Sequence, residues 1–246
     1  MVQISARLKA IADMVPEGLS VADIGCDHGF VSMYLVENRH SPKAIAMDIN
    51  EGPLIRAREH IEEYGFENNI ETRLSDGADM LKVHETDAAV IAGMGGRLII
   101  KILDKSPEVF KAMNCIVLSP HSDIDKVRAY LSDNSFVIDD ENMVFDEGKY
   151  YTIIRCSYNA GENIRLNETE LSFGPKLIDK KHAVLRAYLE AEDRKMVEIS
   201  DRITGQLEAV NNDGQRKALS DRLTEIEDRR NIIENTLCKV TDVAQN

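Results

Sequence analysis

The sequence predicts a doubly wound α/β domain followed by an antiparallel helical hairpin, and three observations support this fold class. Short apolar runs alternate with helical stretches from about residue 19 to residue 159. Apart from Asp23 near the end of the first, the runs at residues 21–24, 44–47, 88–91 and 115–118 are continuously apolar, as in strands that are buried on both faces of a parallel sheet. From about residue 161, apolar residues instead recur at alternating spacings of four and three, which is typical of a coiled-coil seam. We therefore expect two domains, residues 1–160 and 161–246.

The composition of the 246 residues is that of a globular protein, with 43% hydrophobic and 30% charged residues. The 43 acidic and 30 basic residues leave a net charge of −13, the wrong sign for coating nucleic acid by bulk charge. The four cysteines have no metal or redox spacing, and no segment resembles a signal peptide or a membrane span. We expect a soluble cytoplasmic protein with reduced thiols, no metal and no membrane contact.

The first domain is predicted to begin with an amphipathic helix, since Ile4, Leu8, Ile11 and Val15 share one helical face. Parallel strands are expected at residues 21–24, 44–47, 70–74, 88–91 and 115–118. Helices are expected between them at residues 30–38, 51–64, 96–103 and 123–131, with right-handed crossovers. A β-hairpin of residues 136–145 and 150–156, turning at Gly148, completes a mostly parallel sheet of seven strands.

The second domain is predicted to consist of two heptad helices joined at residues 211–214. The seam residues of the first helix are Leu185, Leu189, Met196, Ile199, Ile203 and Val210. Those of the second are Leu219, Leu223, Ile226, Ile233, Leu237 and Val240. Glu192, Gln206 and Arg230 are polar interruptions of the seam. Whether this hairpin folds on itself or pairs with another chain is left open, with a monomer favoured.

The turn after the first strand contains Asp23, Gly25, Asp27 and Gly29. A dinucleotide site requires a second glycine where this chain has Asp27, because the backbone must approach a pyrophosphate there. The pattern instead resembles motif I of class I S-adenosylmethionine-dependent methyltransferases, whose cofactor carries an ammonium and a sulfonium but no phosphate. An acidic turn suits that cofactor. An ordinary strand-to-helix turn is the alternative for the glycines taken alone.

Three later features support a cofactor site, because each follows a strand at the same edge of the sheet. Asp48, 23 residues after Gly25, can accept the two ribose hydroxyl groups. Asp76 can accept the adenine amino group, and the glycines from Gly93 to Gly96 imply a close backbone approach. The predicted cofactor residues are Asp23, Gly25, Cys26, Asp27, Gly29, Asp48, Ile49, Asp76, Gly77, Gly93 and Met94.

The loop after the fourth strand also restricts the methyl acceptor. Enzymes of this superfamily that methylate exocyclic base amines usually carry an (Asp/Asn)-Pro-Pro-aromatic run there, and this chain has Ala92–Gly96 instead. A ring nitrogen such as adenine N1 has an in-plane lone pair and needs alignment more than a strong base. The positive charge that develops on the base favours a nearby carboxylate, for which Asp27 is the candidate.

The chain as a whole resembles the bacterial tRNA (adenine(22)-N(1))-methyltransferases of the TrmK type. The segments that carry the resemblance are residues 5–12, 15–18, 23–28, 52–53, 91–96 and 148–151. The resemblance implies a Rossmann-like methyltransferase domain, S-adenosylmethionine as methyl donor and a folded tRNA as acceptor. The chain departs from the family at residues 29–32, where Ala-Tyr-Leu-Pro is usual, and at residues 119–121, where Gln-Pro-Asn is usual.

Asp27, His28 and Tyr150 are the predicted catalytic residues. His28 could instead cap the following helix, and of Tyr150 and Tyr151 one should face the core while the other could lie beneath a flipped base. His121 is slightly favoured as a helix cap over a base contact. The predicted substrate-binding residues are Arg7, Gly95, Gly96, Pro120, His121, Lys180, Lys181 and Arg186.

The charge distribution favours the helical domain as the part that grips tRNA, since residues 161–246 hold 14 basic and 17 acidic residues against 16 and 26 in residues 1–160. We therefore expect an enzyme that methylates N1 of a tRNA adenine, at position 22 by the resemblance. One alternative is a methyltransferase of a protein or small molecule with the hairpin as a dimerisation arm. The other is a coiled-coil interaction protein without catalytic activity.

Overall fold

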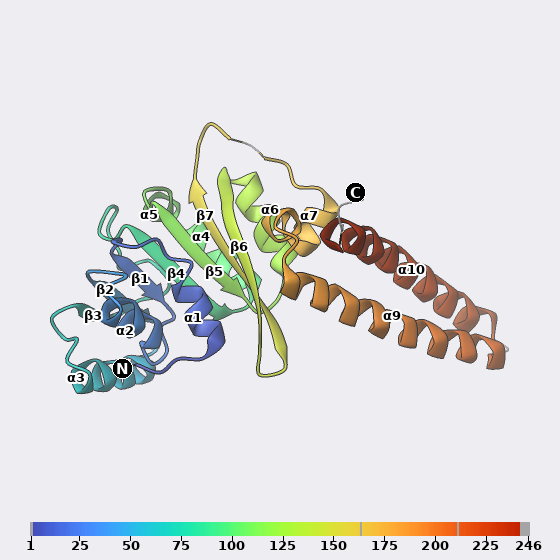
Figure 1. Ribbon diagram of the computed structural model, residues 1–246, viewed down its shortest axis with the longest axis horizontal. Coiled ribbons are helices and arrows are strands. Elements are labelled where there is room, and N and C mark those ends of the chain that lie inside the picture. The colour runs from blue at the N-terminus through green and yellow to red at the C-terminus, as the bar shows by residue number, and fades with distance from the viewer. Residues whose placement is uncertain (1, 163, 211, 242–246) are drawn as a thin grey trace. The chain divides into compact units, whose positions relative to one another are not determined.

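The computed structural model describes residues 2–162, 164–210 and 212–241, and Figure 1 shows its elements. Seven strands form one sheet in the order β3-β2-β1-β4-β5-β7-β6. The strands are β1 (Val21–Ile24), β2 (Ala44–Asp48), β3 (Ile70–Leu74), β4 (Ala88–Met94), β5 (Cys115–Pro120), β6 (Phe136–Asp146) and β7 (Lys149–Tyr158). The first five are parallel and follow the Rossmann order, which confirms the predicted fold class.

Helices connect the strands and continue beyond the sheet. In the first part of the chain they are α1 (Ala6–Ala12), α2 (Phe30–Glu37), α3 (Glu51–Glu63), α4 (Gly96–Lys105), α5 (Pro107–Lys111) and α6 (Ile124–Asp133). They are followed by α7 (Glu168–Phe173), α8 (Pro175–Asp179), α9 (Ala183–Ala209) and α10 (Asp213–Thr241). The short helices α5, α7 and α8 carry too few residues for a periodic pattern, so the sequence did not predict them.

The apolar strands are buried on both faces because helices cover each face. Ile91 packs in one cluster with Ile99 of α4, whereas the neighbouring Val90 packs in another with Ile11 of α1. Consecutive strand residues therefore serve two separate cores, as the period of two in a strand requires. Val90, Ile91 and Ile99 are all fully buried.

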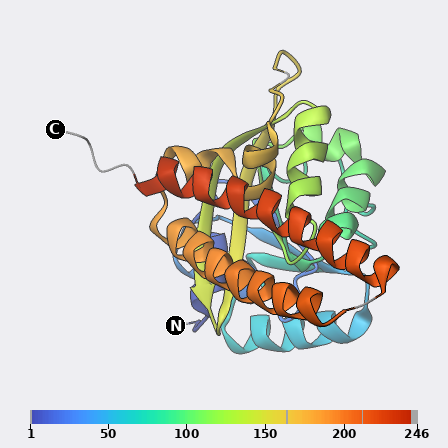
Figure 2. The same cartoon turned by 90° about the vertical axis from the view of Figure 1, so that its right-hand side faces the viewer.

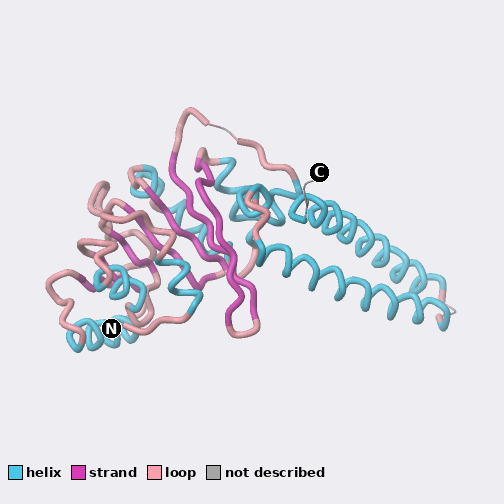
Figure 3. Tube along the Cα trace, in the orientation of Figure 1, coloured by secondary structure: helices cyan, strands magenta, loops and turns pink. Residues whose placement is uncertain are grey.

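The β6–β7 hairpin extends past the end of β5. Strand β7 pairs antiparallel with β5 only over Ile154–Cys156, whereas its pairing with β6 continues to Asp146 and Lys149. The tube in Figure 3 shows the two long strands running beyond the parallel strands to a tight turn. This projecting turn lies at the carboxyl edge of the sheet, because β5 ends in that direction.

A buried ion pair attaches α7 to the sheet. Arg128 of α6 donates from Nε to Oε1 of Glu141 in β6 at 2.8 Å, and the two side chains are 1% and 0% exposed. Arg128 also donates to the carbonyl of Leu171, and Glu141 accepts the backbone N–H of Lys176. A Cβ at Gly174 would lie 2.5 Å from the Glu141 carboxylate, so only glycine fits there.

The chain divides into two compact units, Met1–Lys176 and Leu177–Asn246. The sequence predicts the boundary at residues 160/161, and α7 belongs to the first unit because it packs on α6. In the second unit, α9 and α10 lie side by side (Figure 2), as a hairpin that packs against itself. Asn211 of the predicted turn lies outside the described residues.

The hairpin seam follows the heptads with one shift. Ile203, Ile226, Ile233 and Val240 are buried as predicted, but between Ile233 and Val240 the seam position is taken by the fully buried Thr236 rather than by Leu237. A straight helix has 3.6 residues per turn, so a seam of period 3.5 drifts toward the neighbouring position. Within the described residues, no helix has the length and apolar character to cross a bilayer, and no His, Cys, Asp and Glu side chains cluster as metal ligands.

Candidate active site

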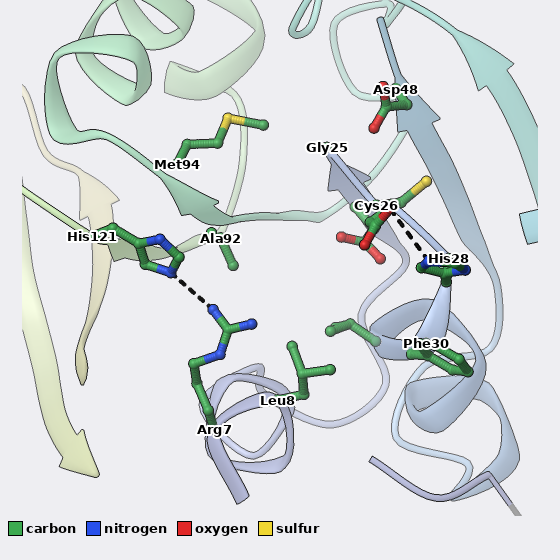
Figure 4. Close-up of a pocket in the computed structure, with 14 residues that line it drawn as sticks. Arg7, Leu8, Gly25, Cys26, His28, Phe30, Asp48, Ala92, Met94 and His121 are labelled. Atoms are coloured by element: carbon green, nitrogen blue, oxygen red, sulfur yellow. Dashed lines mark hydrogen bonds and ion pairs between the residues drawn. The ribbon is translucent and has the colours of Figure 1, made fainter. Parts of the chain in front are cut away.

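A pocket of about 390 Å³ opens at the carboxyl ends of β1, β2 and β4, a size suited to a small ligand. Figure 4 shows that side chains from α1, from the loop after β5 and from the turn after β1 face this space. The lining residues are Arg7, Leu8, Asp23, Gly25, Cys26, Asp27, His28, Phe30, Val31, Asp48, Ala92, Gly93, Met94 and His121. The pocket brings together residues that are more than 110 positions apart, such as Arg7 and His121.

Asp23 supplies a buried carboxylate at the base of the pocket. Its side chain accepts the hydroxyl of Ser32 at 2.8 Å, and the residue is 4% exposed. Burial raises the pKa of Asp23 to about 6, the Ser32 hydrogen bond opposes this shift, and the charge of Asp48 adds to it. Within the described residues no cationic side chain pairs with Asp23. The pocket therefore favours a positively charged ligand group.

The turn between β1 and α2 needs glycine at a defined point. Gly25 has a φ of +77°, and a Cβ on it would lie 2.0 Å from the terminal methyl carbon of Met94. The backbone N–H groups of Gly25 and Cys26 both donate to the carbonyl of Met47, which holds the turn against β2. The backbone is thus exposed to the pocket at Gly25, and the Met94 side chain extends into the same pocket from β4 (Figure 4).

Asp27 and His28 lie together at the pocket rim. Asp27 Oδ1 is 3.7 Å from His28 Nε2 and 3.6 Å from an Arg56 nitrogen, and 69% of the Asp27 side chain is exposed. The His28 ring stacks against Phe30 and His60, and its buried Nδ1 has no hydrogen-bond partner among the described residues. His28 does not cap α2, because the N-cap residue is Gly29.

The opposite wall of the pocket is formed by Arg7 and His121. Arg7 donates from Nη1 to His121 Nε2 at 3.0 Å, which requires a neutral His121 ring. Burial lowers the pKa of His121, and the charges of Arg7 and Lys149 lower it further. His121 is not the helix cap that the sequence favours, because Asp123 occupies the N-cap of α6.

The two adjacent tyrosines of β7 point to opposite faces of the sheet. Tyr151 lies beside the pocket, with the Arg7 guanidinium 5.0 Å from its ring centroid and the His121 ring centroid at 5.7 Å. Tyr150 instead packs against Phe145 across the hairpin, with ring centroids 4.7 Å apart. Tyr151 therefore replaces Tyr150 as the tyrosine next to the pocket.

Several predicted site residues lie outside the pocket lining. Asp76 forms an ion pair with Lys105 at 2.7 Å, and this hydrogen bond lowers the pKa of Asp76. Gly77 packs on Ile102, while 59% of Ile49 is exposed to solvent. Gly95, Gly96 and Pro120 are also absent from the lining.

The glycines at the carboxyl end of β4 serve different purposes. A Cβ on Gly96 would lie 2.4 Å from the carbonyl oxygen of Ser122, so Gly96 is required for contact with the loop after β5 rather than with a ligand. Gly93 lines the pocket and has a φ of +78°. Of the glycines for which the sequence predicts a close backbone approach, Gly93 therefore faces the pocket, whereas Gly96 allows the start of α4 to pack on the loop after β5.

The sequence did not single out several residues of the site. Leu8, Phe30, Val31 and Ala92 line the pocket, and Ser32 holds Asp23. Leu8 was assigned only to an amphipathic face, and a helix face does not reveal which of its residues meets a pocket rather than a core. In the second unit, Lys180 and Lys181 lie in the turn before α9 rather than on the helix, and Arg186 is 3.9 Å from Glu190.

Comparisons with known proteins agree with this geometry. A family model described as a methyltransferase domain matches residues 4–154. A tRNA (adenine(22)-N(1))-methyltransferase of Bacillus subtilis is 31% identical over 225 residues, which are 90% of this chain and 94% of the relative.

Solved structures extend the similarity to both units. A putative tRNA (m1A22) methyltransferase of Streptococcus pneumoniae, in complex with S-adenosyl-L-methionine, is 28% identical with a TM-score of 0.79. The match covers 96% of this chain and 100% of that chain. TrmK of M. capricolum, in complex with S-adenosyl-homocysteine, is 27% identical with a TM-score of 0.74, and the match covers 94% of this chain and 99% of that chain.

Proposed function

This chain belongs to the tRNA (adenine(22)-N(1))-methyltransferase family, and from that premise we propose that it transfers a methyl group from S-adenosylmethionine to N1 of an adenine in tRNA. The observation that carries the proposal is the pocket at the carboxyl ends of β1, β2 and β4, with a buried Asp23 that pairs with no cationic side chain in the described part of the chain. A dinucleotide would bring a pyrophosphate against Asp23, Asp27 and Asp48, which like charge disfavours.

The residues of the pocket fit S-adenosylmethionine. The cofactor supplies an electrophilic methyl group on a positively charged sulfur. Asp23 is suited to the ammonium of its methionine part, because an opposite charge relieves the unfavourable burial of the carboxylate. Asp48, at the end of β2, is suited to the ribose hydroxyls. Gly25 and Gly93 leave backbone free of side chains where the two strands face the pocket.

The adenine part of the cofactor is assigned to the exposed Ile49 and to Asp76. Ile49 directly follows Asp48 and offers an apolar surface to a purine ring. Asp76 already shares its carboxylate with Lys105, so it would accept the adenine amine as a second donor. Gly77 has a φ of +63° and places the backbone of this turn against α4.

The target adenine is assigned to the side of the pocket that lies between Asp27 and His121. Adenine N1 carries a free lone pair, so the chain has to align it and need not remove a proton. The exposed Asp27 carboxylate is placed to balance the positive charge that methylation creates on the base. Arg7, His121 and Tyr151 form the opposite wall and would restrict the orientation of the base.

The second unit is assigned to the tRNA backbone through Lys180, Lys181 and Arg186. All three residues are exposed at the start of this unit. The protein as a whole has a net charge of −13, so phosphate contacts must come from such local groups. Recognition then depends on the shape of the tRNA more than on non-specific attraction.

Methyl transfer to unmodified bulk tRNA tests the proposal directly. With S-adenosylmethionine labelled in its methyl group, the label should appear in tRNA and nucleoside analysis should identify 1-methyladenosine. Label in a protein or small-molecule fraction without RNA would instead favour the alternative acceptors. Absence of S-adenosylmethionine binding in calorimetry would contradict an enzymatic function altogether.

The role of Asp27 can be tested in the same assay. The variant D27A should still bind S-adenosylmethionine, because Asp23 and Asp48 remain, but its turnover should fall by about 100-fold or more. The matched variant D27N keeps the shape and removes the charge, so it separates base orientation from charge balance. Full turnover of D27A would remove Asp27 from this role.

A further inference from the structure

An exposed aromatic pair at the tip of the β6–β7 hairpin has no part in the site described above. Phe145 of β6 and Tyr150 of β7 are paired in register, and their ring centroids are 4.7 Å apart at an interplanar angle of 51°. Phe145 is 55% exposed, although a large apolar ring is normally buried. A tilted aromatic pair with one ring open to solvent offers a π face for a further planar group.

The pair lies near the pocket because of the strand register. Strand β7 leaves β5 at Ile154, so Tyr150 lies on the part of the hairpin that extends beyond the carboxyl end of β5. The hairpin is also bonded to α1, since Asp146 Oδ2 accepts the backbone N–H of Arg7 at 3.0 Å. Arg7 lines the pocket and contacts Tyr151, the residue next to Tyr150. The aromatic pair therefore lies on the same hairpin end as Tyr151, on the opposite face from it.

The charges at the tip of the hairpin do not favour contact with a phosphate group. Asp146 and Glu147 stand in the same turn as Lys149, so the tip has no excess of positive charge for a phosphate. Base faces are neutral, and aromatic side chains bind them without regard to charge. In a chain with a net charge of −13, contacts that do not depend on phosphate are especially valuable for binding RNA.

We propose that Phe145 and Tyr150 form a stacking platform for an unpaired nucleobase of the tRNA that flanks the target adenine. This inference rests on the proposed function, because it takes tRNA as the substrate of the adjacent pocket. The platform holds the neighbouring nucleotide while the target base enters the pocket, as single-stranded RNA is usually held by aromatic stacking. Both residues are positioning residues, since neither lines the pocket.

The test measures the affinity of the full-length protein for unmodified tRNA without cofactor. F145A and Y150A should each bind tRNA about 5- to 100-fold more weakly than the wild type. F145W and Y150F keep the π faces and should stay within about twofold of the wild type. The slope of affinity against salt concentration should not change, because stacking releases no counterions. A merely structural role would not produce this combination.

The matched control is a second aromatic pair at the other edge of the sheet. Tyr64 and Phe66 follow α3 and precede β3, and Tyr64 is 39% exposed. Y64A should leave tRNA affinity unchanged. S-adenosylmethionine affinity, measured by calorimetry, should be the same in all five variants because none lines the pocket.

Three results would overturn the platform. The first is wild-type tRNA affinity in F145A and Y150A, and the second is an F145W protein that binds tRNA as weakly as F145A. A change of oligomeric state in F145A, seen in ultracentrifugation without loss of tRNA affinity, would likewise replace the platform with a contact between protein chains. Failure of the wild type to methylate tRNA would contradict the proposed function instead, since the binding measurement needs no methyl transfer.

Discussion

The two units of the molecule each contain an ion pair of the same length in very different surroundings. Arg128 and Glu141 lie 2.8 Å apart in the first unit and are 1% and 0% exposed. Arg230 and Asp193 lie 2.8 Å apart between α10 and α9 of the second unit and are 30% and 25% exposed. A partly exposed pair is screened by water, whereas a buried pair leaves an uncompensated charge when one partner is lost.

The difference shows how the two units use charge. In the first unit, buried charged groups stand at defined places: Asp23 faces the pocket, and Arg128 with Glu141 holds the segment that leads to Gly174. In the second unit, most charged side chains lie on solvated helix faces. Substitutions of charge should therefore have large, specific effects in the first unit and small, additive effects in the second.

The largest effect is expected for Arg128. R128M should lower the free energy of unfolding of the first unit by about 3–5 kcal/mol, because Glu141 stays buried without its partner. Chemical denaturation followed by circular dichroism measures the change. The double variant R128M/E141L should recover most of the loss, since it removes both buried charges.

The control for Arg128 is the pair in the second unit. R230M should lower the free energy of unfolding by less than about 1 kcal/mol, as for other partly exposed pairs. Equal losses in R128M and R230M would break the comparison between the units.

The next largest effect concerns the glycine turn. G25A should weaken S-adenosylmethionine binding by about 10- to 100-fold, because its Cβ would displace the flexible Met94 methyl group at the pocket and its φ of +77° is strained for alanine. G18A is the matched control, with a φ of +85° and nothing within 4 Å of its Cβ. Both variants carry similar backbone strain, so calorimetry should find weaker binding in G25A alone.

The pH dependence of cofactor binding sharpens the role of Asp23. The folded protein has a raised pKa of about 6 for this carboxyl, so the group is ionised above that pH and protonated below it. S-adenosylmethionine affinity should therefore fall about tenfold for each pH unit below about 6, as the negative charge that binds the ammonium is lost. Titration calorimetry from about pH 5 to about pH 8, a range that brackets this pKa, measures the affinity.

The variant D23N provides the control for this pH dependence. It should bind S-adenosylmethionine weakly at every pH, and its affinity should not vary around pH 6. Burial raises the pKa of Asp23, so its ionisation as the pH rises through about 6 destabilises the protein without cofactor. D23N should therefore be more stable than the wild type at about pH 7. An unchanged pH profile in D23N would assign the titration to another group.

The smallest effect is expected for three basic residues at the start of the second unit. Neutralising Lys180, Lys181 and Arg186 together should weaken tRNA binding about fivefold and reduce its salt slope by about 2. Filter binding at several salt concentrations measures both quantities. An unchanged affinity with a normal slope would show that this surface does not contact tRNA. It would also contradict the assignment of methyl transfer to the first unit and phosphate contacts to the second.

The fold and the polar half of the site could be predicted from the sequence because both depend on local patterns. Uninterrupted apolar runs identify strands buried on both faces, and the order of strands and helices limits the topology. The carboxyl ends of parallel strands meet at one edge, so the sequence places Asp23, Asp27, Asp48 and Gly93 together, and all four line the pocket.

The sequence alone thus determined the seven strands, the longer helices and which polar groups gather at one edge. Only the tertiary structure decided which of two neighbours faces a site, as with Tyr151 over Tyr150, because alternation in a strand does not say which face is which. It also decided that Lys105 engages Asp76 and that Arg7 engages His121. Such pairs join distant segments, and their partners are set by the packing of helices on the sheet rather than by any spacing along the chain.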